Sequence, residues 1–400
     1  MDDGREDRRD GGVKLSLNSQ SNLFRAVLSI LAGFVIVGVL LKMSGYSPLQ
    51  CYQALAEGAT GIRSGKPINL SDRGFYIGSW QGNFSPYTFA QTLATITPLL
   101  FCGLAIALGL RAGLFNIGAL GQMTLGAMTA AFVGAIGAHG SLKPVAGSLP
   151  HWAHVPLALL AGAVAGGLWG ALAGYLKAKR GVHEVLSTIM LNYIALNLAN
   201  YLAMHNLKDP NPSNMAAQTG LIAKSAWLTP IVAQSSLTVG LLLAVAAAVG
   251  VAFLLWRTAL GYEIRAVGLG AEAARTAGIP VSQILIKTMA MSGALAGVAG
   301  ALEVMGIHHR FVQGTAGDYG FDGIAVALLG GSHPFGIVLS ASFFGALGNG
   351  ANFMQIQTDV PKTIAVVVQA IIVLLVGLRF RRTESAKPLV LAEKEGRKDG

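Results

Sequence analysis

Several amide and hydroxyl side chains stand inside stretches of sequence that are otherwise apolar. Thr188, Asn192 and Asn197 share one uncharged stretch, and Gln122 lies in another. On a helix with about 100° per residue, Asn192 and Asn200 would lie about 80° apart, with Asn197 within about 60° of Asn200. These residues therefore predict one broad polar face. Such groups are costly in lipid and point inward, where they line a solute pathway or join helices through hydrogen bonds; the sequence leaves both interpretations open.

Two dipeptides interrupt apolar runs, one in each half of the chain. Phe115-Asn116 and Phe321-Asp322 each place an N-cap type of residue before an apolar run dotted with glycine. Paired interrupted segments are the best sequence pointer to the binding site of a transporter. The N-terminus of a half-helix directs unsatisfied N–H groups and a partial positive charge at a polar ligand. We therefore expect both dipeptides at a solute pathway, with simple helix capping as the alternative.

The segment 257–283 is a basic connection between two apolar stretches. Its helix-forming residues lie between Gly270 and Gly278 and stop at Pro280, which predicts a short surface helix at about 270–277. A helix lying on the membrane surface can push against a soluble partner. The alternative is an ordinary amphipathic connector.

One uncharged stretch carries glycines at a constant spacing of four residues. They are Gly162, Gly166, Gly170 and Gly174. This spacing places a glycine groove on one helix face and allows another backbone to approach closely. Gly293 and Gly297 repeat the device in a later stretch. We expect helix packing inside the subunit, with a subunit interface or a pathway wall as the alternatives.

The residue types needed for covalent chemistry are missing from the middle of the apolar stretches. No paired carboxylate and no nucleophile–base constellation occurs there, which disfavours an intramembrane enzyme. The nearest lookalike of a phosphate-binding loop, Gly61 to Pro67, has the wrong glycine spacing and a proline where Ser or Thr would bind magnesium. ATP hydrolysis, if it drives this protein, therefore belongs to another chain.

The sequence predicts no metal site and no cofactor. Cys51 and Cys102 are the two cysteines, and the scattered histidines lack the spacing of metal ligands. Lys287 and Glu303 would lie about 24 Å apart along one helix. We therefore expect both side chains near the ends of their span, reaching toward the membrane surfaces.

The elements that position these residues are predicted to be membrane-spanning helices. Apolar residues make up 53% of the chain and charged residues 12%, against about 25% charged in soluble domains. The mean hydropathy is +0.56. A crossing needs about 20 mostly apolar residues. The stretches that qualify are 23–43, 88–110, 116–138, 155–176, 185–204, 236–256, 284–306, 335–353 and 362–379.

Basic residues cluster at the ends of these stretches, which accounts for the net charge of +10 without a nucleic-acid partner. The positive-inside rule places both termini and 257–283 in the cytoplasm. Nine full crossings would leave the C-terminus outside, so a broken or re-entrant element is expected at 320–335. The prediction is an all-α polytopic membrane protein with about ten transmembrane elements. Its transmembrane domain, 23–380, would lie between a polar tail, 1–22, and a disordered charged tail, 381–400.

Four motifs have a recognisable pattern. The loop 265–279 reads RAVGLGAEAARTAGI, and the stretches 113–123 and 323–331 read GLFNIGALGQM and GIAVALLGG. The stretch 181–195 reads GVHEVLSTIMLNYIA. Together they resemble the permease subunits of bacterial ABC importers, in the branch that transports branched-chain amino acids, ribose and nucleosides, and 181–195 is similar to the nucleoside type. The Ile-x-Leu-Pro that ends the Glu-Ala-Ala loop in other importer permeases is absent.

The resemblance implies a transport subunit of the bacterial inner membrane that is not itself an enzyme. The implied partners are an ABC ATP-binding subunit, a second homologous permease subunit in a heterodimer, an extracytoplasmic substrate-binding lipoprotein and membrane lipid. The residues that would couple to the ATP-binding subunit are Arg265, Glu272, Ala273, Ala274 and Gly278. Nucleosides or related sugars are the expected cargo, with ribose-like sugars or branched-chain amino acids as alternatives. An ion-coupled secondary transporter is disfavoured, because the middle of the spans carries almost no ionisable residue.

Overall fold

The computed structural model describes residues 30–62, 84–136, 149–205, 207–209, 217–232, 234–358 and 360–361, with scattered positions between 363 and 374. The predicted tails 1–22 and 381–400 lie outside these residues, as does most of the predicted crossing 362–379. The chain forms two compact units, Met1–Pro48 with Pro361–Gly400, and Leu49–Val360. The first unit contains the short apolar helix Ile30–Met43.

The second unit is built from helices, and its described residues contain isolated bridges but no strand. Two of its apolar helices are short, α4 (Ala119–Gly134) and α11 (Tyr319–Leu329). Six described helices are long and apolar enough to cross a membrane: α3 (Pro86–Arg111), α5 (His151–Arg180), α6 (Glu184–His205), α7 (Gly240–Arg257), α10 (Val281–Glu303) with the π-helical turn Val304–His308 that continues it, and α12 (Pro334–Thr358). The predicted all-α polytopic fold is confirmed.

The long helices begin and end where local chemistry directs. The Ser85 hydroxyl accepts a hydrogen bond from the Thr88 backbone N–H at 3.2 Å, and Pro86 occupies the first turn of α3. α5 ends at Gly181, whose φ of +68° suits glycine. Basic residues in the last turn of α5 complement the negative end of the helix dipole.

The polar connections contain more helix than the sequence predicts. α2 (Pro48–Thr60) lies between the predicted crossings 23–43 and 88–110, where the sequence predicts no helix. In the connection 257–283, α8 (Ala259–Leu269) precedes α9 (Ala271–Thr276). α9 confirms the short helix predicted at 270–277. α8 was missed because its start depends on a cap, in which the Thr258 hydroxyl accepts from the Gly261 N–H at 3.1 Å.

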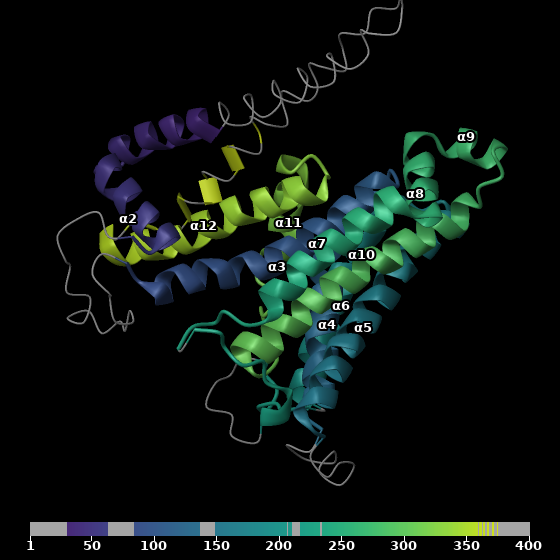
Figure 1. The fold of residues 1–400 in the computed structure, drawn as a ribbon, viewed down its shortest axis with the longest axis horizontal. Coiled ribbons are helices and arrows are strands. Elements are labelled where there is room, and N and C mark those ends of the chain that lie inside the picture. Colours follow the sequence, from purple (N-terminus) through teal and green to yellow (C-terminus); the bar gives the residue numbers. More distant parts are fainter. Residues whose placement is uncertain are drawn as a thin grey trace, which may run out of the picture. The chain divides into compact units, whose positions relative to one another are not determined.

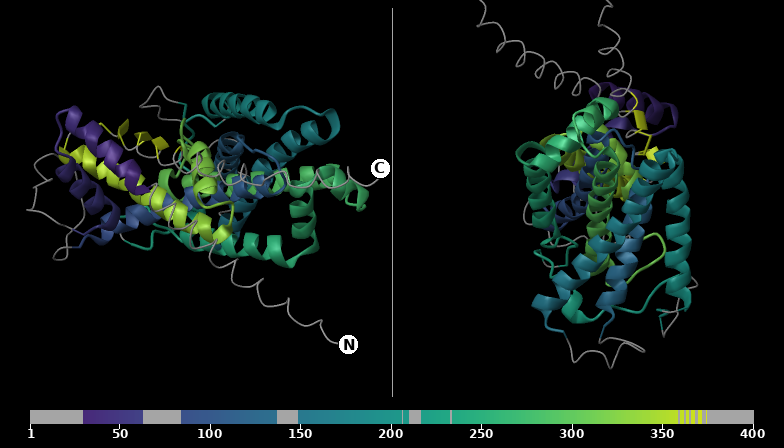
Figure 2. Two further views of the ribbon diagram at one scale, coloured as in Figure 1. Left: turned by 90° about the horizontal axis from the view of Figure 1, so that it is seen from above. Right: turned by 90° about the vertical axis from the view of Figure 1, so that its right-hand side faces the viewer.

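α5 and α10 pack backbone to backbone (Figure 1, Figure 2). A Cβ placed on Gly293 of α10 would lie 2.9 Å from the Gly166 carbonyl carbon and 3.1 Å from the Gly170 Cα atom. Gly162 faces Gly297 in the same way, and Gly174 faces the turn before Met289. The four glycines of α5 therefore lie against α10, where a side chain would push the two helices apart.

Each short helix packs against the long helix of the other half of the chain. α4 lies on α10, where Gly300 leaves room for the backbone around Met123. α11 lies on α3, where a Cβ on Gly323 would be 2.7 Å from the Cys102 Cβ atom. α3 and α10 also contact each other. The centre of the unit is thus formed by one long and one short helix from each half.

Candidate functional site

The short helices α4 and α11 begin next to each other in the interior of the unit. With 16 and 11 residues they span about 24 Å and about 16 Å, less than the roughly 30 Å of hydrocarbon. A Cβ placed on Gly320 would lie 2.5 Å from the Leu120 backbone nitrogen, so the two first turns touch. We call residues 116–122 and 318–323 the half-helix junction.

The two half-helices leave the half-helix junction toward opposite ends of α10. α4 runs to the end of α10 that contacts the segment 217–232, where the Ala223 N–H donates to the Gly134 carbonyl at 2.7 Å and Leu228 binds Met305. α11 runs to the end from which α8 and α9 extend, where Arg111 binds Ser332. Both helix dipoles therefore place their positive ends in the interior. The sequence predicted this pair of interruptions, and the structure brings them together.

Asn116 organises the break in front of α4. Its side chain is fully buried. Its Nδ2 donates to Gln122 Oε1 at 2.9 Å and to Ser292 Oγ at 2.8 Å. Its Oδ1 accepts from the Gly118 N–H at 2.9 Å and from Gln122 Nε2 at 3.2 Å. Ser292 in turn donates to the Ala105 carbonyl at 2.6 Å, which joins α10 to α3.

Asn192 holds the same break from α6. Its Oδ1 accepts from the Gly121 N–H at 2.8 Å, and its Nδ2 donates to the Ile117 carbonyl at 2.9 Å. Thr188, one turn earlier, is fully buried and its Cβ faces Gly118. Backbone groups freed by an interrupted helix must be satisfied inside a membrane protein, and Asn192 meets this need.

The amides of Asn116 and Asn192 are therefore committed to the fold. Asn116 uses both donor hydrogens and both acceptor positions of its amide. We interpret these two residues as groups that position the half-helix junction rather than groups that touch a solute. Gln122 and Asn192 each leave one donor hydrogen and one acceptor position unused, but Asn192 bonds the backbone of the break, whereas Gln122 bonds only the side chain of Asn116.

The other residues predicted for the pathway are not fully buried. Phe115 is partly buried, and Phe321 is 47% exposed. Asp322 lies in the first turn of α11 and not at its N-cap, since the helix begins earlier, after Asp318. Asn197 lies on the exposed side of α6 and its Nδ2 donates to the carbonyl of Tyr193 in its own helix at 2.8 Å. It does not join the half-helix junction within this chain.

Sequence reasoning missed three groups near the half-helix junction. Ser292 gave no signal, because a lone serine beside glycine is common in packed helices. Tyr319 was overlooked because the start of α11 was placed too late. Glu303 was expected to reach the membrane surface, but only 3% of it is exposed. Within the described residues, no group of three His, Cys, Asp or Glu side chains is arranged to hold a metal ion.

The connection that contains α8 and α9 extends beyond the ends of α7 and α10 (Figure 1). Glu272 and Arg275 form an ion pair of 2.8 Å on the exposed surface of α9. Ala274 is buried and ties α9 to the rest of the unit, whereas Leu269 is 92% exposed. Gly278 ends α9 with a φ of +82° and has open space around it. The exposed part of this connection thus carries Leu269 beside the charges of Glu272 and Arg275.

Arg111 links this connection to α11. A Cβ on Gly268 of α8 would collide with the Arg111 carbonyl, so α8 rests on the end of α3. The Arg111 Nε donates to the Ser332 carbonyl in the α11–α12 turn at 2.9 Å. The guanidinium lies 5.4 Å from the centroid of the Trp256 ring, which stands 4.8 Å from the His333 ring. Burial, reinforced by the charge of Arg111, lowers the pKa of His333.

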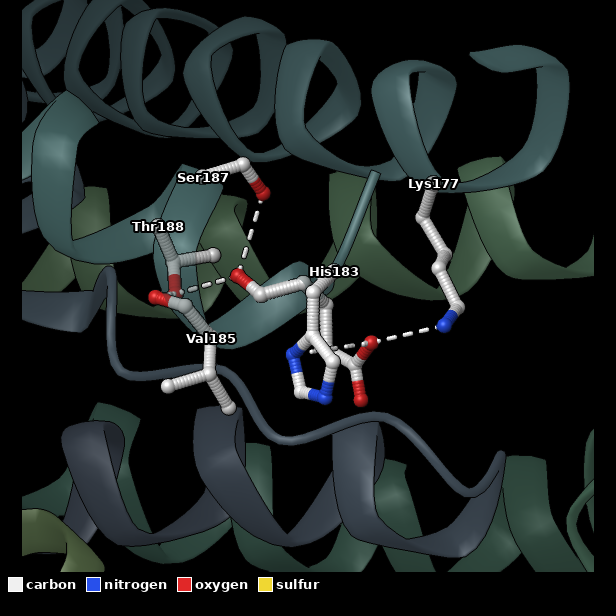
Figure 3. Close-up of polar contacts among 6 residues, drawn as sticks. Lys177, His183, Val185, Ser187 and Thr188 are labelled. Carbon is white, nitrogen blue, oxygen red and sulfur yellow. Dashed lines mark hydrogen bonds and ion pairs between the residues drawn. The ribbon is translucent and has the colours of Figure 1, made fainter. Parts of the chain in front are cut away.

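The α5–α6 connection fixes the start of α6 (Figure 3). Lys177 Nζ lies 2.8 Å from Glu184 Oε2, and His183 Nδ1 lies 3.9 Å from the same oxygen. The Thr188 hydroxyl donates to the Glu184 carbonyl at 2.8 Å. Since Thr188 faces Gly118, these contacts connect the end of the helix pair to the half-helix junction.

Comparison with known proteins gives a consistent result. Residues 88–377 match the family described as branched-chain amino acid transport system permease component. The chain is 38% identical over 362 residues to the guanosine ABC transporter permease protein NupP of Bacillus subtilis, covering 90% of this chain and 94% of the relative. It is 32% identical over 371 residues to the nucleoside ABC transporter permease protein NupB of Lactococcus lactis, covering 91% and 93%. It is 30% identical over 385 residues to the glucose ABC transporter permease protein TsgB13 of Haloferax volcanii, covering 90% and 92%.

The fold and the site define a polytopic membrane transport protein with paired half-helices at its centre. The chain belongs to the family of branched-chain amino acid transport system permease components. The resemblance predicted from the sequence motifs is confirmed, and the chain is a permease subunit of an ABC transporter.

Proposed function

We propose that this permease imports nucleosides by alternating access at the half-helix junction. The observation that supports this most is the convergence of the α4 and α11 N-termini on a buried set of amide, hydroxyl and carboxylate groups. The two relatives whose names refer to guanosine or nucleosides align with at least 90% of the chain. Phe115, Gln122, Phe321 and Asp322 are the predicted pathway residues that we assign to its lining. Asn116, Thr188 and Asn192 position the break.

ATP hydrolysis takes place on a separate ATP-binding subunit that docks on α8 and α9. Arg265, Glu272, Ala273, Ala274 and Gly278 form the docking and coupling segment. Closure of the ATP-binding subunits pushes α8 against the end of α3. Arg111 passes the movement to the α11–α12 turn, and hence to the half-helix junction.

A second, homologous permease subunit covers the exposed side of α6. Tyr193 and Tyr201 are 62% and 57% exposed there, and Asn197 lies between them. An amide that faces lipid is costly, so a polar stripe at this depth fits a protein partner better than hydrocarbon. This face would then border the pathway between the two subunits, which keeps Asn197 as a proposed pathway residue.

We also assign the membrane in which the chain lies and its orientation there. The chain spans the bacterial inner membrane through one transmembrane domain, residues 23–380. Both termini and the connection 257–283 face the cytoplasm, because the basic clusters favour that orientation. An extracytoplasmic lipoprotein delivers the solute to the other face.

A sugar importer is the second candidate, because a glucose permease is 30% identical over most of the chain. Uptake of radiolabelled guanosine and glucose in cells with and without this gene separates the two. Loss of guanosine uptake alone supports the proposal, and loss of glucose uptake alone overturns it.

The coupling role of the α9 segment has a matched test. Gly278 and Gly314 both have positive φ, +82° and +88°, and neither has a neighbour within 4 Å of a built Cβ. Gly278→Val and Gly314→Val therefore impose a similar local strain of about 1–2 kcal/mol at different places in the fold. Gly278→Val should release the ATP-binding subunit during purification, whereas Gly314→Val should retain it. Equal retention by both variants would refute the docking role.

The charge of α9 is tested with Glu272→Lys. This change should lower guanosine uptake, because it breaks the ion pair with Arg275 and reverses the charge presented to the partner. Glu272→Gln, which removes the charge without reversing it, serves as the control and should have a smaller effect. Wild-type uptake in Glu272→Lys would contradict a contact through this residue.

A further inference from the structure

The carboxylate of Glu303 is buried without an explanation in the packing of the chain. The residue ends the α-helical part of α10, is 3% exposed, and precedes the π-helical turn Val304–His308. π-helical turns are frequent at functional sites. Its one ion pair, with His308 Nε2, has a separation of 3.7 Å, which is longer than a hydrogen bond.

Glu303 receives no hydrogen bond from any described part of the chain. A buried carboxylate normally accepts several, since burial of an unpaired charge is strongly unfavourable. Replacement of Glu303 by a neutral residue would therefore remove the unfavourable free energy of burying this charge. A role in stability does not account for this side chain.

The surroundings of Glu303 place it at the half-helix junction. Gly300, one turn earlier in α10, fits against the α4 backbone at Met123. Met123 Sδ lies 3.8 Å from Cys102 Sγ. Cys102 and Tyr319 lie within electrostatic range of the Glu303 side chain, and Tyr319 is the first residue of α11. The positive ends of α4 and α11 meet in this same region and favour an anionic group.

Tyr319 adds a second unpaired polar group. Its hydroxyl makes no hydrogen bond to the residues that the structure describes. Tyr319 is partly buried, and tyrosine hydroxyls that leave bulk water usually have a partner. A carboxylate and a hydroxyl, neither of which makes a hydrogen bond to the described residues, therefore stand beside the start of α11.

We propose that Glu303 and Tyr319 bind the transported solute, and that Glu303 selects a neutral solute with two adjacent hydrogen-bond donors. This inference rests on the proposed function and names the recognition group for it. A carboxylate accepts two parallel hydrogen bonds from such a pair. In a nucleoside the pair has two sources: the N1–H and 2-amino edge of guanine, or the 2′- and 3′-hydroxyls of ribose. The adenine edge offers one donor beside one acceptor and does not fit.

The test uses the assembled importer with Glu303→Gln, which keeps the size of the side chain and replaces one acceptor by a donor. Glu57→Gln is the matched control. Glu57 is also a buried glutamate, but it accepts from Gln357 Nε2 at 3.0 Å in the contact between α2 and α12. His308→Gln tests whether Glu303 acts only through its ion pair. All variants are compared for assembly and for initial uptake of guanosine, adenosine and 2′,3′-dideoxyguanosine.

Glu303→Gln loses one charge-assisted hydrogen bond and places an N–H group against a donor of the solute, which should lower the uptake efficiency of the recognised solutes about tenfold to a hundredfold. If the importer recognises the guanine edge, Glu303→Gln should lower the uptake of guanosine and dideoxyguanosine and leave the uptake of adenosine unchanged. If the importer recognises the ribose diol, Glu303→Gln should lower the uptake of guanosine and adenosine and leave the uptake of dideoxyguanosine unchanged. Glu57→Gln and His308→Gln should keep the wild-type order of solutes.

Three results would overturn the inference. They are an unchanged solute order in Glu303→Gln, an equal loss of all three solutes, and the same change of order in His308→Gln. These outcomes are distinct from a failure of the proposed function, in which the wild-type importer itself takes up no nucleoside. Tyr319→Phe should weaken uptake of the recognised solutes less than Glu303→Gln, because it removes one neutral hydrogen bond and places no donor against a donor of the solute.

Discussion

The contact between α5 and α10 makes a sharp prediction about glycine. A Cβ on Gly293 would lie 2.9 Å from the Gly166 carbonyl carbon, and the backbone there can yield only if the helices move apart. Gly250 is the matched position, since it also lies within a long helix but has no atom within 4 Å of a built Cβ. We therefore expect opposite effects from Gly293→Ala and Gly250→Ala.

The expected change in the free energy of unfolding has two contributions, helix propensity and packing. Alanine is favoured over glycine within a helix by about 1 kcal/mol, and this gain applies to both positions. At Gly293 it is opposed by overpacking, which costs about 1–3 kcal/mol in a close-packed interior, and by the weaker dispersion attraction between helices that have moved apart. The gain cancels between the two variants, so Gly250→Ala should be neutral or stabilising, and Gly293→Ala should be less stable than Gly250→Ala by about 1–3 kcal/mol.

The assay uses the cysteines of the chain itself. Both Cys51 and Cys102 are free and buried, so a maleimide dye labels this chain only when it opens. Labelling during a thermal ramp, read on the band of this subunit, gives the unfolding midpoint in the assembled importer. Gly293→Ala should lower the midpoint and Gly250→Ala should not. A midpoint of Gly293→Ala equal to or above that of Gly250→Ala would refute the backbone contact.

Three further predictions concern the groups around α3 and α4. Asn116→Ala should prevent stable folding, because it leaves buried partners such as Ser292 without their hydrogen bonds at about 1–3 kcal/mol each; normal yield and midpoint would contradict this. Arg111→Lys loses the guanidinium fork that joins Ser332, and should lower uptake while ATP hydrolysis continues; equal losses of both rates would argue against a linking role. His333 has a pKa below its ordinary value of 6.5, so the unfolded chain binds the proton more tightly and stability should fall as the pH drops below about 6.5. His333→Gln should flatten that dependence of the midpoint between about pH 8 and about pH 5, and an unchanged slope would refute it.

The membrane architecture was readable from the sequence because it depends on length, hydropathy and charge placement. The stretch 116–138 shows the limit of that reasoning. Its composition suits a full crossing, yet α4 begins only at Ala119, because Asn116 and Asn192 satisfy a backbone that turns inside the bundle. Hydropathy does not separate a full crossing from an extended entry followed by a half-helix.

The site was predictable in part. Asn116 and Asp322 marked the two interruptions, because residues of N-cap type are rare before apolar runs. The meeting of the two interruptions depends on close approach at Gly320, which no local pattern reveals. Glu303 was misplaced because distance along a helix locates a residue along its axis but not around it. The face that a residue presents is decided by the neighbouring helices, here α4 and α11.

In the proposed function, an ATP-driven pump moves nucleosides through this subunit. Uptake of radiolabelled guanosine into proteoliposomes that contain the assembled importer and its binding lipoprotein tests it most directly. ATP on the side of the ATP-binding subunits should drive uptake, and proton or sodium ionophores should leave it unchanged. Uptake that persists without ATP and collapses when the ion gradient is removed would contradict an ATP-driven mechanism.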